Sequence, residues 1–320
     1  METRLTKLCH ISRPVIQGGL AYLARAPLAA AVSEAGGLGQ ITATTLEDAQ
    51  ALRREIRAVK DATPKPFAVN FAIGHRPIDD LLDAALEEGV PAVSLTGGNP
   101  APYARRITDQ KVLLLVLTAG VRAAQKAEGL GADVIIAVGA EGGGHLGRDD
   151  VGTVVLTRRV VQSVRVPVVA SGGIGDGQGL LAALALGAEG IEMGTRFVAT
   201  VECGAHPSYK ARLIAAREND TQVIERSIGR PGRVIPSPYV DDILAAEQSV
   251  RDAQDLFPWI AGDRNHTAAV LGDWERGFAW GGQVCGLIED VPTVRELMDR
   301  MEQEAKTAWN HLGRIMARNL

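Results

Sequence analysis

Short apolar runs alternate with longer amphipathic segments over the first 197 residues. The runs are rich in Val, Ile, Leu and Ala, which is typical of strands buried on both faces, and the segments between them have a helical period. The pattern predicts eight strands, at 14–17, 38–42, 66–71, 92–96, 112–117, 133–138, 166–170 and 191–193. Because parallel strands need crossover connections, usually helices, the alternation predicts an α/β fold, a (β/α)8 TIM barrel.

The helices of this barrel are predicted from their apolar periodicity and their end signals. Asp176 is a short acceptor just before an apolar pattern, so it is predicted to cap a helix that Gly187 ends. The other predicted helices are 27–35, 46–60, 78–88, 119–129 and 153–164.

The pattern changes after residue 199. Residues 200–280 read as helices, at 207–218 and 239–252, with irregular connections and no alternating strands. We predict a helical excursion that caps the barrel mouth as a lid. A closing segment, which returns the chain to the barrel, begins at residues 281–283. A long amphipathic helix is predicted from residue 294 to the C-terminus. Residues 1–199 and 281–320 are therefore assigned to the barrel, and residues 200–280 to a lid or substrate subdomain.

Composition narrows the class of protein. The chain is 46% hydrophobic and 4% aromatic, with 36 Gly and a net charge of −4, which suits an aliphatic barrel and argues against nucleic acid. The 3 Cys lack the spacing of a disulfide framework or a metal site, and the longest aliphatic run, 112–117, is too short to span a membrane. We expect a soluble, cytoplasmic protein with no metal and no membrane contact.

Two consecutive strands end in small residues that expose backbone N–H groups. Ser171, Gly172 and Gly173 follow the seventh strand, and Gly194 and Thr195 follow the eighth. In β/α barrels the loops after strands seven and eight often bind phosphate. For either loop alone, the alternative interpretation is an ordinary strand–helix–strand unit with glycine turns. The two loops together favour phosphate binding.

Other polar residues lie where strands end, which is where β/α barrels place their active sites. His145 lies on the glycine-rich loop 139–147 and is predicted to contact substrate or to act as acid or base, the alternative being a surface histidine. Gln17 and Asn70 offer amide groups that suit a pyrimidine-like ring edge. Motifs for phosphate-loop hydrolysis, serine hydrolysis and zinc proteolysis are missing from the sequence.

Together these motifs resemble the nitronate monooxygenase (2-nitropropane dioxygenase-like) family of FMN-dependent β/α barrels. The resemblance covers nearly the whole chain and rests on 15–19, 35–38, 66–70, 141–147, 170–174, 193–197 and 282–283. It implies FMN, with its phosphate on Gly172, Gly173, Gly194 and Thr195 and His145 on the substrate side. It also implies cofactor contacts from Gln17, Gly18, Gly19, Asn70, Ser171 and Gln283.

Residues 97–103 and 205–210 resemble the FMN-dependent enoyl-acyl-carrier-protein reductases, which share the fold. The leading hypothesis is a nitronate monooxygenase-like oxidation of alkyl nitronates or nitroalkanes with O2 to a carbonyl compound and nitrite. The alternatives are an NAD(P)H-dependent reductase of enoyl thioesters or quinones, and a non-catalytic flavin- or phosphate-binding barrel. The expected partner is a small-molecule substrate, and a homodimer is the expected assembly.

Overall fold

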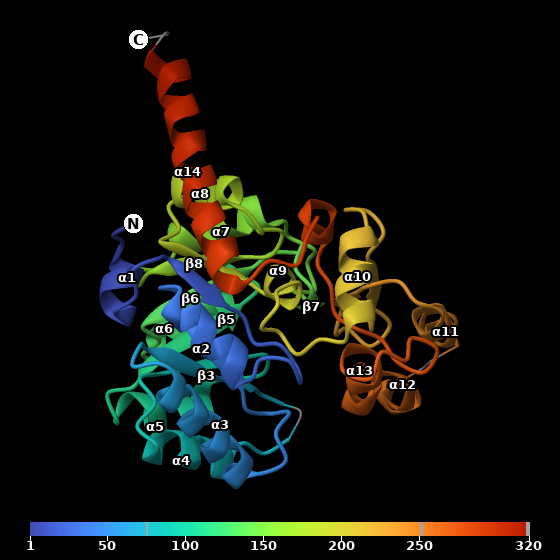
Figure 1. Ribbon diagram of the computed structural model, residues 1–320. Coiled ribbons are helices and arrows are strands. Elements are labelled where there is room, and N and C mark those ends of the chain that lie inside the picture. The colour runs from blue at the N-terminus through green and yellow to red at the C-terminus, as the bar shows by residue number, and fades with distance from the viewer. Residues whose placement is uncertain (75, 250–251, 318–320) are drawn as a thin grey trace.

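The computed structural model describes residues 1–74, 76–249 and 252–317. One 8-stranded sheet runs in the order β1-β9-β8-β6-β5-β4-β3-β2 with parallel pairing throughout, and a parallel bridge between Ile16 and Leu38 joins its two edges. This closure confirms the predicted (β/α)8 barrel (Figure 1). Its strands are β1 (Val15–Gln17), β2 (Gly39–Thr42), β3 (Phe67–Ala72), β4 (Ala92–Thr96), β5 (Leu113–Thr118), β6 (Val134–Val138), β8 (Val168–Ser171) and β9 (Gly190–Met193).

Successive residues of each strand enter two different cores. In β6, Val134 and Ile136 pack inside the barrel, whereas Ile135 and Ala137 pack outward against the helices. Side chains that alternate across a sheet produce an unbroken apolar run when both faces are buried. This is why the barrel strands could be recognised from their composition.

Helices surround the barrel (Figure 1). Each helix that the sequence predicted between the strands is present, and the side chain of Asp176 caps α8 by accepting a hydrogen bond from the Gly179 N–H at 2.7 Å. Three helices, α1, α5 and α9, were not predicted. The helices of the barrel are α1 (Arg4–Cys9), α2 (Ala26–Glu34), α3 (Ala49–Ala62), α4 (Asp79–Glu87), α5 (Ala101–Thr108), α6 (Val121–Gly129), α7 (Thr153–Val161), α8 (Gly177–Ala185) and α9 (Thr195–Val198).

The prediction that residues 200–280 consist of helices and irregular connections is incomplete, because the region also contains two short strands. β10 (Gln222–Ile224) and β11 (Gly232–Val234) form a hairpin, and β11 also pairs with β7 (Gly144–His145), which places His145 on a strand rather than on a loop. Strands of two or three residues are too short for a periodic signal. The helices here are α10 (Pro207–Ala215), α11 (Pro238–Glu247), α12 (Ala253–Ile260) and α13 (Gly262–Ala269), and residues 250 and 251 of the predicted helix 239–252 lie outside the described residues.

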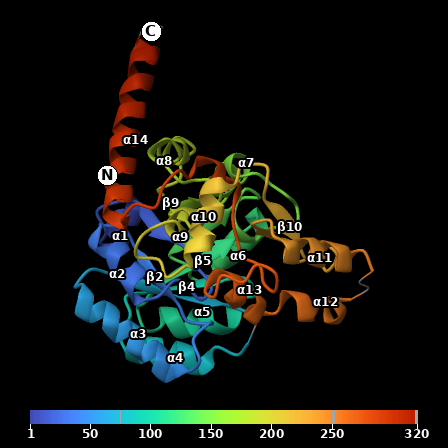
Figure 2. The same ribbon diagram turned by 45° about the vertical axis from the view of Figure 1, so that its right-hand side comes forward.

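Figures 1 and 2 show α10 to α13 gathered on one side of the barrel. Within this excursion, Trp280 forms an antiparallel bridge with Val234 of β11. The division of the chain into barrel and lid stays a prediction.

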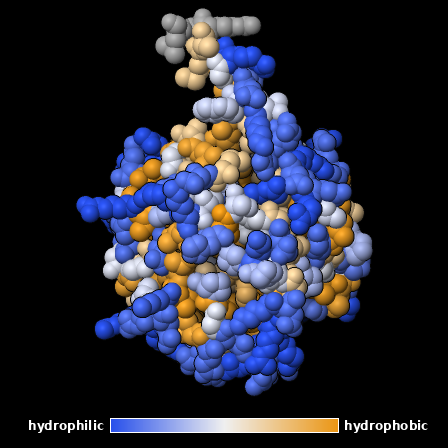
Figure 3. All heavy atoms as spheres, turned by 60° about the vertical axis from the view of Figure 1, so that its left-hand side comes forward, coloured by the Kyte–Doolittle hydropathy of each residue, from blue (hydrophilic) through white to orange (hydrophobic). Residues whose placement is uncertain are grey.

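The last helix, α14 (Val294–Ala317), packs along α8 and then leaves the body of the molecule (Figures 1 to 3). Leu297, Met298 and Met301 are buried, whereas Trp309 and Met316 are exposed. Residues 318–320 of the predicted final helix lie outside the described residues. In the described part of the chain, no helix is both long enough and apolar enough to cross a membrane. The homodimer stays a prediction.

Close contact between α8 and α14 depends on a glycine. A Cβ atom at Gly177 would overlap the carbonyl oxygen of Met301, whereas a Cβ at Gly313 has no neighbour within 4 Å. We expect Gly177→Ala to lower the free energy of unfolding by about 1–3 kcal/mol because two backbones must separate. Gly313→Ala should raise it by up to about 1 kcal/mol, because alanine favours the helix. Urea unfolding of both variants tests this, and equal effects would contradict the packing argument.

Candidate active site

The loops after β6 and β8 meet at the C-terminal end of the barrel. A Cβ atom at Gly172 would lie 3.0 Å from the carbonyl oxygen of Gly139 and 3.0 Å from the amide nitrogen of Gly142. The Thr153 hydroxyl at the start of α7 donates to the Gly172 carbonyl at 2.9 Å. Glu141 accepts a hydrogen bond from the Thr153 N–H at 3.1 Å, so its carboxylate pairs with a backbone amide. The glycines at 139, 142 and 172 therefore allow the loops to touch.

These loops leave hydrogen-bond donors available. Within the described residues, the N–H groups of Gly172, Gly173 and Gly194 donate to no protein acceptor. Gly172 and Gly173 have φ of +96° and +76°, a conformation that L side chains rarely adopt. Successive N–H groups left unpaired at strand ends form a cradle for an anion such as phosphate. The residues fit the phosphate group that the sequence predicted here.

The closing segment completes this region from a distant part of the chain. The Gly282 N–H donates to the Thr195 hydroxyl at 3.0 Å, and the Gln283 N–H, at the start of the 3-10 helix η1 (Gln283–Leu287), donates to the Glu141 carbonyl at 2.9 Å. The predicted residues Thr195 and Gln283 therefore lie at the same mouth, next to the loops after β6 and β9.

Gln17, Gly18 and Gly19 follow β1 into the same end of the barrel. The buried Gln17 amide donates to the Gly18 carbonyl and accepts from the Gln40 N–H at 2.9 Å. The Gln17 side chain could contact a ligand only by giving up these hydrogen bonds to the protein. The Asn70 amide donates to the Ser94 hydroxyl at 2.8 Å, and a Cβ at Gly19 would overlap its side-chain oxygen. Asn70 therefore lies directly beside Gly19.

His145 is held in place by residues of the 200–280 excursion. Its Cα partner across the strand pair is Gly232, and its ring packs on Trp280 with centroids 4.9 Å apart and planes tilted by 48°. Nε2 of His145 lies 3.7 Å from a carboxylate oxygen of Glu225, and the His145 side chain is 40% exposed. Trp280 and Glu225 were missed by the sequence analysis, because nothing local marks them as neighbours of position 145.

The sequence profile of the nitronate monooxygenase family matches residues 2–304. The chain belongs to this family. It is 33% identical to the nitronate monooxygenase of Pseudomonas aeruginosa over 95% of this chain and 99% of that protein. It is 30% identical to a (3aS,4S,5R,7aS)-5-hydroxy-7a-methyl-1-oxo-octahydro-1H-indene-4-carboxyl-CoA dehydrogenase of Rhodococcus jostii, over 99% of each. The solved structure of FabK from Thermotoga maritima superposes with a TM-score of 0.93 and 39% identity, over 98% of each chain.

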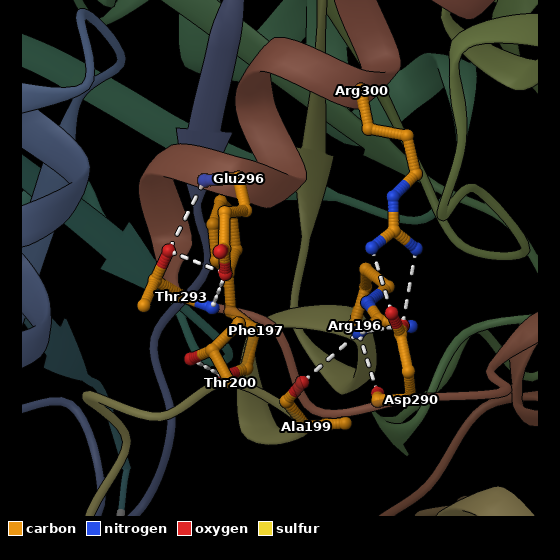
Figure 4. Close-up of polar contacts among 8 residues, drawn as sticks. All are labelled: Arg196, Phe197, Ala199, Thr200, Asp290, Thr293, Glu296 and Arg300. Carbon is orange, nitrogen blue, oxygen red and sulfur yellow. Dashed lines mark hydrogen bonds and ion pairs between the residues drawn. The ribbon is translucent and has the colours of Figure 1, made fainter.

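In this member of the nitronate monooxygenase family, Asp290 connects α14 to α9 (Figure 4). The buried Arg196 donates to the carbonyls of Ala199 and Asp290 at 3.0 and 2.9 Å, and Arg300 of α14 donates to both carboxylate oxygens of Asp290, at 3.1 and 2.6 Å. The Arg300 hydrogen bonds hold the pKa of Asp290 below its usual value, whereas burial lowers the pKa of Arg196. The segment from Gln283 to Asp290 is thus anchored at both ends, by the bonds of Gln283 and by those of Asp290.

Glu192 is a buried carboxyl that the sequence analysis missed. It lies on β9, is 5% exposed, and accepts a hydrogen bond from the Ser171 hydroxyl at 3.1 Å. A Cβ at Gly18 would lie 3.4 Å from its side-chain carbons, so the carboxyl sits beside the backbone at the barrel mouth. Burial raises the pKa of Glu192 to about 7, and the Ser171 hydrogen bond lowers it in part. The sequence did contain a signal for this site residue, because a glutamate stands within an otherwise apolar strand.

A cavity of about 420 Å³ lies elsewhere, at the N-terminal end of the strands, and is lined by residues that include Arg13, Glu34 and Lys65. In β/α barrels that end contributes to stability and the opposite end to catalysis. We therefore place the candidate active site at the mouth formed by the cradle and His145.

The raised pKa of Glu192 makes the stability of the apoprotein depend on pH. Its folded pKa lies above its unfolded value, so its contribution to stability is complete below the unfolded pKa and is lost as pH rises to about 7. We expect the free energy of unfolding to fall over this window by up to about 1.4 kcal/mol per pH unit, and Glu192→Gln to remove this fall. Urea unfolding at pH 5 and pH 8 measures it, with the exposed Glu275→Gln as control. Equal pH dependence in all three proteins would refute it.

Proposed function

We propose that the protein is an FMN-dependent oxidoreductase that oxidises alkyl nitronates with O2 to a carbonyl compound and nitrite. The observation that carries this proposal is the glycine cradle, whose unpaired N–H groups lie at the same mouth as His145. Membership of the nitronate monooxygenase family supports it. The proposed partner is a small molecule, and the acidic chain makes nucleic acid an unsuitable one.

Several residues would hold FMN. Its phosphate would accept hydrogen bonds from Gly172, Gly173 and Gly194, whose N–H groups have no partner in the described chain. Asn70, Gly19 and Gln283 would border the rest of the cofactor. When bound, FMN would accept the electron pair that leaves the substrate carbon. The protein contributes position and electrostatics.

His145 acts on the substrate in this proposal. A protonated ring would orient a nitronate anion, and a neutral ring would take the α-proton of a nitroalkane, a task that suits histidine at neutral pH. Trp280 under the ring limits its rotation, because the two rings pack with centroids 4.9 Å apart.

Anaerobic mixing of the holoprotein with propyl 2-nitronate tests the reaction. We expect the visible flavin absorbance to bleach and to return on admission of O2, with one carbonyl and one nitrite per turnover. His145→Ala should keep its flavin and lose at least about 100-fold in the rate of bleaching by 2-nitropropane, because this neutral nitroalkane needs the α-proton transfer that His145 supplies, which is worth roughly this factor. Failure of the wild type to bleach excludes nitronate oxidation.

The similarity to FabK favours a second candidate, the NAD(P)H-dependent reduction of an enoyl thioester or a quinone. Arg148 donates to the Gly229 carbonyl at 2.7 Å and lies with Arg230 on the loops next to His145, where both would suit the phosphates of an acyl carrier. Anaerobic NADH or NADPH that bleaches the flavin, followed by reoxidation with crotonyl-CoA or menadione, would identify this reaction. A flavin that neither nitronate nor nicotinamide reduces would favour a non-catalytic binding barrel.

The cradle itself can be tested by flavin retention. At Gly172 a Cβ would press on two backbone atoms of the loop after β6, whereas at Gly89, whose φ is +66°, it has no neighbour within 4 Å. Both glycine-to-alanine changes strain a positive φ at a cost of about 1–2 kcal/mol, but only Gly172→Ala should purify without flavin. The ratio of flavin absorbance to protein absorbance measures this. Full flavin content in Gly172→Ala would contradict the assigned phosphate site.

A further inference from the structure

Glu225 has an unusual backbone conformation for a buried glutamate. It follows β10 directly, is 2% exposed and has φ of +63°, in the left-handed region. Left-handed backbone is costly for residues other than glycine and persists where the surroundings enforce it, often at functional sites. The position of this side chain is therefore determined by the fold around it.

Two neighbours hold the backbone of Glu225 in place. The Arg230 N–H donates to the Glu225 carbonyl at 3.0 Å. The carboxylate of Glu247, at the end of α11, lies close to the Glu225 N–H and the Ser227 hydroxyl, and burial, the largest effect, raises the pKa of Glu247. The left-handed backbone of Glu225 and its hydrogen bond from Arg230 together set the direction of its side chain.

The side chain of Glu225 is directed at His145. Its Oε2 atom is buried and accepts no hydrogen bond within the described chain, and it lies 3.7 Å from Nε2 of His145. A buried carboxylate oxygen without a donor is costly, so a cation or an N–H nearby is strongly favoured. A separation of 3.7 Å is longer than a hydrogen bond, and contacts of this kind often shorten when substrate binds.

The other sides of the imidazole are also defined by the excursion. Trp280 packs on the ring, and Gly232 lies opposite His145 in the strand pair. A Cβ at Gly232 would lie 2.7 Å from the Trp280 ring, so glycine is required for this packing. Glu225, Gly232 and Trp280 of the excursion therefore border the partly exposed ring of His145.

We propose that Glu225 is the positioning residue for His145: its carboxylate faces Nε2, favours the proton on that nitrogen and fixes the orientation of the ring toward the substrate. Carboxylate partners fix the tautomer of functional histidines in this way. The inference rests on the proposed function, because orientation of His145 matters for catalysis if that ring meets the substrate. Glu225 acts through His145 and does not touch the reacting atoms.

The first test observes the ring directly in the resting holoprotein. With ¹⁵N-labelled histidine, the two ring nitrogens of His145 are identified by the signals that disappear in His145→Ala. We expect the wild type to show the proton on Nε2, and Glu225→Gln to shift the population of the two tautomers. Nitrogen signals that are identical in wild type and Glu225→Gln would overturn the proposal, whatever the enzyme turns over.

The second test measures turnover with matched variants. Glu225→Gln should lower kcat by at least tenfold with flavin content and Tm retained, and Glu225→Asp, which keeps the charge, should recover part of the rate. Asp150→Asn removes a carboxylate that pairs with Arg226 near His145 but not against its ring, and it should leave kcat unchanged. Equal rates for wild type and Glu225→Gln would overturn the proposal.

The two tests separate this inference from the proposed function. If wild type reduces its flavin with neither nitronate nor nicotinamide, the proposed function fails while the nitrogen signals still decide the role of Glu225. Should Glu225→Gln fail to fold, the comparison of wild type with Glu225→Asp in the same ¹⁵N experiment decides it: a displaced carboxylate must change the Nε2 signal, and an unchanged signal overturns the inference.

Discussion

Close approach of backbone to backbone at the barrel mouth is the constraint on which the rest of the site depends. Gly139, Gly142 and Gly172 bring the loops after β6 and β8 into contact, and Gly143 lies against Gly282 of the closing segment. A side chain at Gly172 would press on the loop after β6, and one at Gly139 would overlap the start of α7 at Thr153. The N–H groups of Gly172 and Gly173 donate to no acceptor in the described chain, so the glycines that allow the loops to approach also leave donors for an anion.

The proposed cofactor site and the proposed reaction site are built from different parts of the chain. The cradle comes from barrel strands β8 and β9, whose positions are set by the closed sheet. His145 is held instead by Glu225, Gly232 and Trp280, all from the excursion or its return. Changes within residues 200–280 can therefore alter the reaction without disturbing the cradle. This arrangement agrees with the different activities of two relatives, a nitronate monooxygenase and a carboxyl-CoA dehydrogenase.

The parts that the sequence could predict are those with a local physical signal. Barrel strands such as β6 are buried on both faces and read as apolar runs, and glycine pairs such as Gly172–Gly173 mark strand ends. The pairing of β7 with β11 has no such signal, because it joins two short strands far apart in the chain. Helix α1 depends on a capping box at Thr3 and Thr6 rather than on a long periodic pattern. Glu225 and Trp280 became visible as site residues only once the fold brought them to His145.

The mouth is complete only when the end of the chain has docked. Gly282 and Gln283 bond to Thr195 and Glu141, and the same segment continues to Asp290, which Arg196 and Arg300 hold from opposite sides. Contacts between residues this distant in sequence are expected to form late in folding, because the loop that joins them must first close. The proposed anion site beside the C-terminal segment is therefore complete only in the fully folded chain. Ligand binding in turn stabilises the closed state, since a ligand that binds the folded form alone shifts the folding equilibrium toward it.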